Sequence, residues 1–219
     1  MSTFPGSPKL LKGGLVLIDP DSGAVRRIIP FAYNPDTVTR TLSVKGVTGE
    51  SGDRSEALRL TGPPVEKFTC DLELDATDQL EFPEQNRLAA TTGIHAQLAA
   101  LETIVYPESA RLQSNNRLAQ GGNLEIVPME APLTLFIWSK SRVVPVRVTE
   151  LSIIEEAFDP ALNPIRAKVS LGMHVLSVND LEWGHRGAGL FMAYHQQKEA
   201  FAARAQSGTL NALGTPRIA

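Results

Sequence analysis

Three carboxylates stand close together near the middle of residues 149–177 and could act as an acid–base pair. Glu155 and Glu156 are adjacent, and Asp159 follows shortly after them. Paired carboxylates move protons when both side chains face a common cleft and differ in protonation state. These three lie where a strand is expected to end in a turn, so we interpret them as a solvated or subunit-facing charge group.

The histidines and the single cysteine do not form a metal-binding pattern. No histidine stands at a metal-ligand spacing from another, and Cys70 has no neighbouring ligand in the sequence. Cys70 lies in the apolar phase of an expected strand, so we expect a buried and unreactive thiol. We therefore expect no metal and no cofactor. The histidines are His95, His174, His185 and His195.

Two glycine-rich segments are poor matches to nucleotide-binding loops. Residues 46–55, GVTGESGDRS, lack the GK[ST] ending whose lysine reaches a phosphate. Residues 184–189, GHRGAG, do not fit GxGxxG and are interpreted as a hinge. The chain also lacks the GxSxG elbow of many hydrolases. We expect a protein that is not an enzyme.

The composition is that of an ordinary soluble protein. The 219 residues are 42% hydrophobic and 21% charged, with a formal net charge of -3. This weakly acidic balance gives no overall attraction to nucleic acid or anionic lipid. The N-terminus lacks an apolar signal core, and no apolar run approaches the ~20 residues that span a bilayer. We expect synthesis in the cytoplasm, no nucleic-acid partner and no membrane insertion.

The elements that position the acidic cluster are strands. Apolar side chains occupy the odd positions from Ile165 to Val175, and polar side chains such as Lys168 and Ser170 fall between them. This alternation predicts a strand with one buried face. The preceding residues 158–164, FDPALNP, carry two prolines and turn-forming side chains, which predicts a fixed chain reversal.

The strand expected at residues 143–158 changes phase near Thr149. Its apolar residues are even-numbered up to Val148 and odd-numbered from Leu151. A slip of one residue inside a strand indicates a β-bulge or a bend.

The rest of the chain also favours strands over helices. Long polar stretches at 45–64 and 108–124 predict a loop and an irregular or partly helical segment. Strands are expected at 14–18, 24–33, 37–44, 65–74 and 133–138, and helices at 93–105 and about 188–206, with a frayed tail at 207–219.

Four segments together resemble the N-terminal domain shared by the tube and tube-initiator proteins of contractile injection systems, which are phage-tail-like particles. They are PFAYNPDTVTRTLSV (30–44), GPPVEKFTCDLELDATD (62–78), GIHAQLAALETIVYP (93–107) and PVRVTELSIIEEAFDPALNPIRAKVSLGMHVL (145–176). Their combination of YNP, LDATD, QLAALE and EEAFDPALNPIRA is fairly specific. Many family members continue into a peptidoglycan-type LysM module, which we expect this chain to lack.

The resemblance implies a mainly-β (α+β) fold. This is a tube-protein-like antiparallel β-barrel or sandwich with one outer helix and a short C-terminal helix. It implies a tube-like domain at 1–184 and a helix-and-tail extension at 185–219. It also implies a ring-forming, hexameric structural subunit, whose partners are further copies, the spike protein, the inner tube protein and other baseplate subunits. The assembled particle would be cytoplasmic, membrane-anchored or released.

Within that family, a tube initiator is favoured over a bulk inner-tube subunit. The initiator ring lies in the baseplate, links the spike to the inner tube and templates tube assembly. Segments 108–130 and 185–219 extend beyond a minimal barrel, and such appendages indicate specialised contacts. The residues expected at subunit or ring interfaces are Tyr33, Asn34, Pro35, Glu155, Glu156, Phe158, Asp159, Asn163 and Pro164.

A β-sandwich that binds a ligand or a carbohydrate is the alternative of another class. Such a module needs a concave pocket lined by aromatic side chains. Aromatic residues make up only 6% of the chain, and Trp138 and Trp183 are far apart in sequence. An enzyme ranks third, since catalytic residues that converge only in the fold leave no sequence motif.

Overall fold

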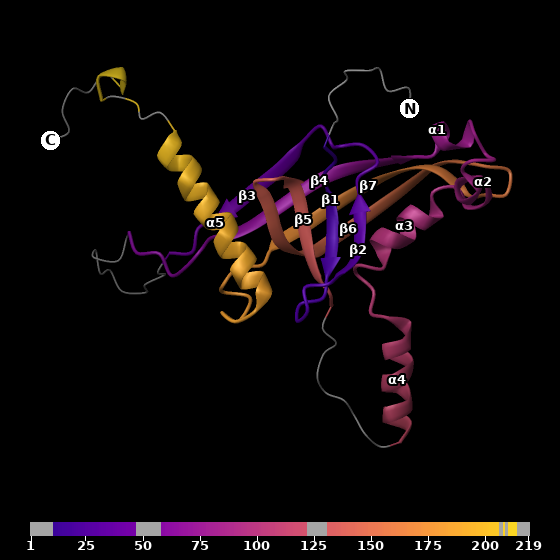
Figure 1. Ribbon diagram of the computed structural model, residues 1–219, viewed down its shortest axis with the longest axis horizontal. Helices are drawn as coiled ribbons and strands as arrows, with labels where there is room; N and C mark the ends of the chain where they lie inside the picture. The colour runs from indigo at the N-terminus through magenta and orange to yellow at the C-terminus, as the bar shows by residue number, and fades with distance from the viewer. Residues whose placement is uncertain (1–10, 47–57, 122–130, 206–207, 209, 214–219) are drawn as a thin grey trace.

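Seven antiparallel strands form one sheet in a computed structural model that describes residues 11–46, 58–121, 131–205, 208 and 210–213 (Figure 1). The sheet order is β2-β1-β5-β6-β7-β4-β3, so β2 and β3 are its edge strands. The strands are β1 (Gly14–Ile18), β2 (Val25–Pro30), β3 (Val38–Ser43), β4 (Val65–Asp75), β5 (Leu133–Ser139), β6 (Arg142–Phe158) and β7 (Pro164–Val175). The expected mainly-β, α+β fold class is confirmed, and ring formation stays a prediction.

The phase slip in β6 is a β-bulge, as predicted. The register against β7 shifts between Val148 and Glu150, which leaves Thr149 without a partner. Because of the bulge, the apolar residues after Thr149 point to the same face of the sheet as Val146, which precedes the bulge. Gly172 pairs with Glu150 at this point, and a Cβ added there would lie 3.0 Å from the Glu150 Cβ. Glycine therefore leaves the room that the bulge requires.

One face of the sheet carries the core. The alternating residues of β4 and β7 are buried on this face, and Phe136 of β5 lies at its centre. Its ring centroid is 5.3 Å from that of Phe68, 6.0 Å from that of Trp138 and 6.4 Å from that of Phe31. Cys70 is buried in the same core, and burial raises the pKa of its thiol to about 11. The expectation of a buried thiol is confirmed.

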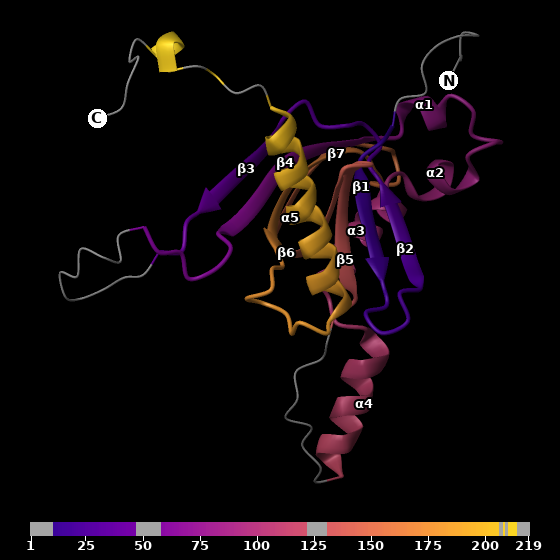
Figure 2. The ribbon, with the colours of Figure 1, turned by 60° about the vertical axis from the view of Figure 1, so that its left-hand side comes forward.

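The helices exceed the few that the sequence indicated. The two expected helices are α3 (His95–Glu102), which is shorter than predicted, and α5 (Arg186–Arg204). The segment predicted to be irregular or partly helical contains α4 (Ser109–Gln120). The additional elements are α1 (Thr77–Leu80), α2 (Arg87–Thr92) and the 3₁₀ turn η2 (Leu210–Leu213). α4 has no buried residue and projects away from the sheet (Figure 2). Apolar periodicity could not reveal α4, because the sequence of this helix has no apolar stripe.

The glycine-rich segment at 184–189 is the start of α5. The side chain of His185 accepts a hydrogen bond of 3.0 Å from the Gly187 amide and caps the helix. A Cβ at Gly187 would lie 2.5 Å from Leu181 Cδ1, so glycine permits this close packing. The segment therefore closes a helix onto the preceding loop, and the hinge interpretation was wrong for residues 186–189.

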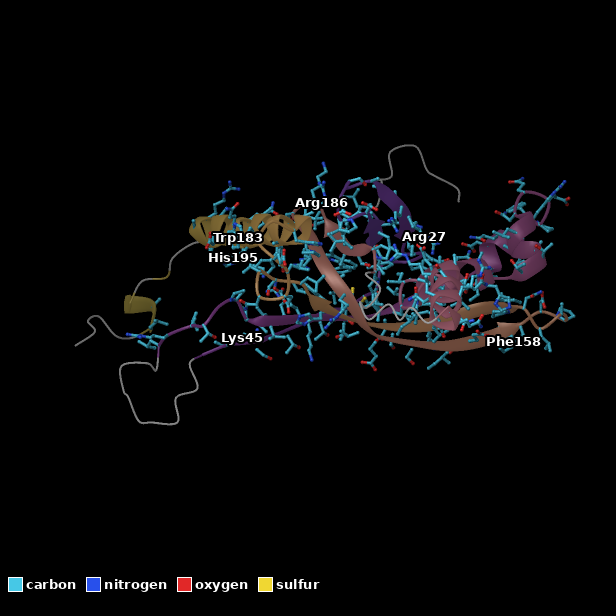
Figure 3. All side chains as sticks on the ribbon, turned by 90° about the horizontal axis from the view of Figure 1, so that it is seen from below. Arg27, Lys45, Phe158, Trp183, Arg186 and His195 are labelled. Atoms are coloured by element: carbon cyan, nitrogen blue, oxygen red, sulfur yellow. The ribbon has the colours of Figure 1, made fainter. Side chains whose placement is uncertain are left out.

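The described helices and the short β1–β2 hairpin leave the other face of the long strands uncovered. In Figure 3, α5 and α3 lie on one side of the β6–β7 hairpin, which runs from the centre of the molecule to Phe158. Within the described residues, no helix has the length and apolar character needed to cross a bilayer.

Replacing Val169 with Asp should abolish cooperative folding. Val169 is fully buried in β7, and an unpaired charge there costs several kcal/mol. Thermal unfolding by circular dichroism measures the effect. Thr69→Asp is the matched control, because Thr69 points to the uncovered face of β4 and its replacement should change stability by about 0.5 kcal/mol. A cooperative transition retained in Val169→Asp would contradict the assignment of the buried face.

Candidate assembly surfaces

The turn between β6 and β7 is held by the carboxylate of Asp159. Its Oδ1 accepts hydrogen bonds from the amides of Ala161 (2.7 Å) and Asn163 (2.8 Å). Its Oδ2 accepts a third from the side-chain amide of Asn163 (2.7 Å). Leu162 adopts a φ of 65°, a left-handed conformation that a free chain rarely holds. The carboxylate therefore fixes the shape of the turn. We call residues 158–164 the β6–β7 tip.

The tip is also attached to the helices beside it. The Asn163 side chain donates to the Thr91 carbonyl at 3.2 Å, and the Ile94 amide donates to the Pro164 carbonyl at 2.9 Å. Gly93 has a φ of 57°, and a Cβ there would lie 2.1 Å from the Pro164 oxygen. Pro164 is buried by this packing. Both Asn163 and Pro164 thus have roles inside the subunit, and their predicted interface role is untested.

Apolar side chains are exposed at the apex of the tip. Phe158 is 51% exposed and Leu162 is 77% exposed. Large apolar groups held outward on a rigid turn are typical of a contact surface.

The neighbouring carboxylates do not form an acid–base pair. Glu155 and Glu156 are consecutive in a strand, so their side chains point to opposite faces of the sheet. Glu156 forms an ion pair of 3.0 Å with Lys168, and Glu155 is exposed. The arrangement matches the charge-group interpretation.

The predicted residues before β3 lie at the same end of the sheet. Tyr33 is half exposed, and the negative charge of Asp78, at the start of α1, raises the pKa of its phenol. Asn34 accepts a hydrogen bond of 2.8 Å from the Gly13 amide and donates one of 2.8 Å to the Leu11 carbonyl. Asn34 therefore ties the segment after β2 to the segment before β1.

The face of β4, β6 and β7 that no helix covers is a broad polar surface. We call it the open face. Its charges are of both signs and partly paired. Lys168 pairs with Glu156, and the Ser170 hydroxyl donates to Asp71 at 2.6 Å. The side chains on this face are Lys67, Thr69, Asp71, Glu73, Arg147, Glu150, Ser152, Ile154, Glu156, Lys168, Ser170 and His174.

No cluster of three or more potential metal ligands occurs among the described residues. Two of the histidines contact single carboxylates instead. His174 lies 3.5 Å from Asp180, and His195 lies 3.3 Å from Glu199.

A buried carboxylate that the sequence analysis missed anchors α5. Glu66 accepts hydrogen bonds from the Tyr194 hydroxyl (2.8 Å) and from Lys198 (2.7 Å), and Arg40 lies 3.7 Å away. The Lys198 ammonium also lies 4.0 Å from the centre of the Tyr194 ring. Glu66 points to the same face of β4 as Phe68 and Leu74. A charged residue among apolar ones on that face is the feature of the sequence that could have revealed it. Burial, followed by the bond to Glu66, raises the pKa of Tyr194 to about 12.

Comparison with known proteins gives little support for any assignment. No family model matches the chain, and no curated protein matches it. Among solved structures, one described as the tail of an empty GTA particle, computed with helical refinement and C6 symmetry, is similar. It is 13% identical, with a TM-score of 0.28 over 75% of this chain and 90% of that chain. A likeness of this strength carries no argument about fold or function.

Replacing Tyr194 with Phe should lower the free energy of unfolding by about 1–3 kcal/mol, because the buried Glu66 loses a donor. Chemical denaturation measures this change. Tyr106→Phe is the matched control, since the Tyr106 side chain is exposed and should leave stability unchanged. Equal stability of the two variants would show that the hydrogen bond to Glu66 does not anchor α5.

The tip should lose its order in acid. The hydrogen bonds from Asn163 lower the pKa of Asp159, so its stabilising effect is present above the ordinary value of about 3.9 and is lost as the pH falls through the lowered value. The amide chemical shifts of Ala161 and Asn163 should report that titration by NMR. Asp159→Asn should remove it. A midpoint at or above the ordinary value would contradict the hydrogen-bonding role of Asp159.

Proposed function

We propose that this chain is a structural component of a phage-tail-like contractile injection particle. The observation that carries the proposal is the one-sided sheet, in which helices and core lie on one face while the long strands keep an open polar face. In a ring of such subunits, the open faces would line a water-filled channel and the covered faces would point outward. The sequence resemblance to tube and tube-initiator proteins points to the same arrangement.

The sheet edges supply a route to a ring. β2 and β3 end the sheet order, and neither pairs with a further strand among the described residues. Free edges invite strand pairing with another chain. Pairing between unlike edges of identical subunits gives a head-to-tail interface, which forms a closed ring when the rotation per subunit closes. The hexamer is taken from the resemblance.

Within the particle, we assign the chain to the tube initiator ring between the spike and the inner tube. Support comes from α4, which has no buried residue and adds helical surface beyond the sheet and its core. A bulk inner-tube subunit is the alternative. An initiator forms one ring per particle, whereas a tube subunit is present in many rings. Quantitative mass spectrometry of purified particles measures the copy number and so distinguishes the two roles.

A ligand-binding module is the competing function of another class. A groove of about 870 Å³ lies between β2, α3 and the start of α4. Of the described residues that line it, Tyr106 is the one aromatic, whereas Arg26, Arg27, Glu102, Glu108 and Arg111 are charged. This lining differs from the aromatic pockets of carbohydrate-binding modules. A specific small ligand bound by the monomer would favour this alternative.

Replacing Ile28 with Lys should prevent ring formation and leave the subunit folded. Ile28 lies on the edge strand β2 and is 64% exposed, and a charge on an edge strand opposes strand pairing. Negative-stain electron microscopy of the purified protein should show rings for the unchanged chain and none for Ile28→Lys.

A matched control places the same charge on α4, away from β2. Leu112 lines the groove beside β2, so the control is Leu118→Lys further along α4: Leu118 is exposed and does not line that groove. Rings that form equally well in Ile28→Lys would exclude β2 as the joining edge. A chain that stays monomeric at every concentration and never enters particles would contradict the proposed function.

A further inference from the structure

A pocket with an excess of positive charge lies at the end of the sheet opposite the β6–β7 tip. It has a volume of about 320 Å³ and is enclosed by β3, the β5–β6 turn and the C-terminal half of α5. We call it the basic pocket. In Figure 3, Lys45 and His195 lie toward this end of the molecule, and Phe158 lies at the other.

Three cations line the basic pocket, and one buried carboxylate offsets part of their charge. They are Arg40, Arg142 and Lys198. Glu66 is bound by Lys198 at 2.7 Å, while Arg40 is 3.7 Å from it. No carboxylate of the described residues lies within ion-pair distance of Arg142, whose guanidinium has five donors to satisfy. The guanidinium donors of Arg142 are therefore available to bind an anion in the pocket.

The walls between these cations are aromatic. Trp138, Tyr194 and Phe201 line the same pocket, and Phe201 is exposed. The hydroxyls of Ser139 and Ser141, 3.0 Å apart on the β5–β6 turn, add further polar groups. Aromatic walls with guanidinium groups suit a ligand that combines an apolar ring with a nearby carboxylate.

The β6–β7 tip of the same chain has this complementary chemistry. Phe158 and Leu162 project from it, and Glu155 is exposed on the strand that leads into it. The three hydrogen bonds to the Asp159 carboxylate hold the turn in one shape before any partner binds. A preorganised tip loses little conformational entropy on docking.

We propose that the β6–β7 tip of one copy docks in the basic pocket of a second copy. The tip and the pocket are different surfaces at opposite ends of the subunit, so the contact is heterologous and repeats from copy to copy. The proposal rests on the proposed function, since it assigns one of the contacts by which a repeating particle component associates with itself. It differs from pairing of β2 with β3, which uses backbone edges rather than side chains.

The test is a charge exchange between the two surfaces. Arg142→Glu and Glu155→Arg should each raise the protein concentration needed for self-association at least about tenfold, measured by sedimentation velocity. The double variant Arg142→Glu/Glu155→Arg restores opposite charges across the contact and should recover most of the loss. Arg117→Glu and Asp21→Arg are the matched controls, because both residues are exposed and neither lies on an element that lines the pocket or forms the tip. Both controls should associate like the unchanged chain.

Phe158→Ala gives an independent test of the apolar contact. It should also weaken association at least about tenfold, and Tyr106→Ala should not. Thermal melts confirm that each variant is folded, and if Arg142→Glu fails to fold, Glu155→Arg and Phe158→Ala still decide the question. Normal association of Glu155→Arg and Phe158→Ala while rings still form overturns this contact and leaves the proposed function intact. A monomeric unchanged chain overturns both.

Discussion

One extra residue, Thr149, determines which face of β6 is buried along its second half. The strand spans 17 residues, and its apolar side chains change from even to odd positions midway. The bulge between Val148 and Glu150 absorbs this change, and Gly172 across the pair leaves room for it. Both halves of β6 therefore bury the same face against the core. The open polar face and the placement of the tip at the far end follow from that single adjustment.

The sequence predicted what short-range patterns encode. Period-2 alternation identified the strands, the phase slip identified the bulge, and the two prolines identified the tip. For residues 108–124 it predicted only an irregular or partly helical segment, because α4 is helical without an apolar stripe. It did not predict the buried hydrogen bond between Glu66 and Tyr194, residues separated by 128 positions. Contacts of that separation depend on how α5 packs on the sheet. Such packing has no local signature. The division at residue 184 and the interface roles stay predictions.

The shifted carboxylates of this protein organise its turns. Hydrogen bonds from Ser22 lower the pKa of Asp19 in the β1–β2 turn, and those from Asn163 lower the pKa of Asp159 at the tip. Asp19 and Asp159 lie at separate turns, and each accepts hydrogen bonds from residues a few positions along the chain. Both carboxylates thereby fix the shape of their turns.

The burial of Cys70 makes this chain a convenient background for thiol chemistry. Burial raises the pKa of the Cys70 thiol to about 11, so the thiol stays protonated at neutral pH, and the side chain is enclosed by the core. A second cysteine introduced at Thr69 on the open face, or at Ala161 on the tip, would react far faster than the native one. Spin labels, crosslinkers and fluorophores can therefore be placed one site at a time without removing Cys70, so the proposed contacts between copies can be tested by distance measurements.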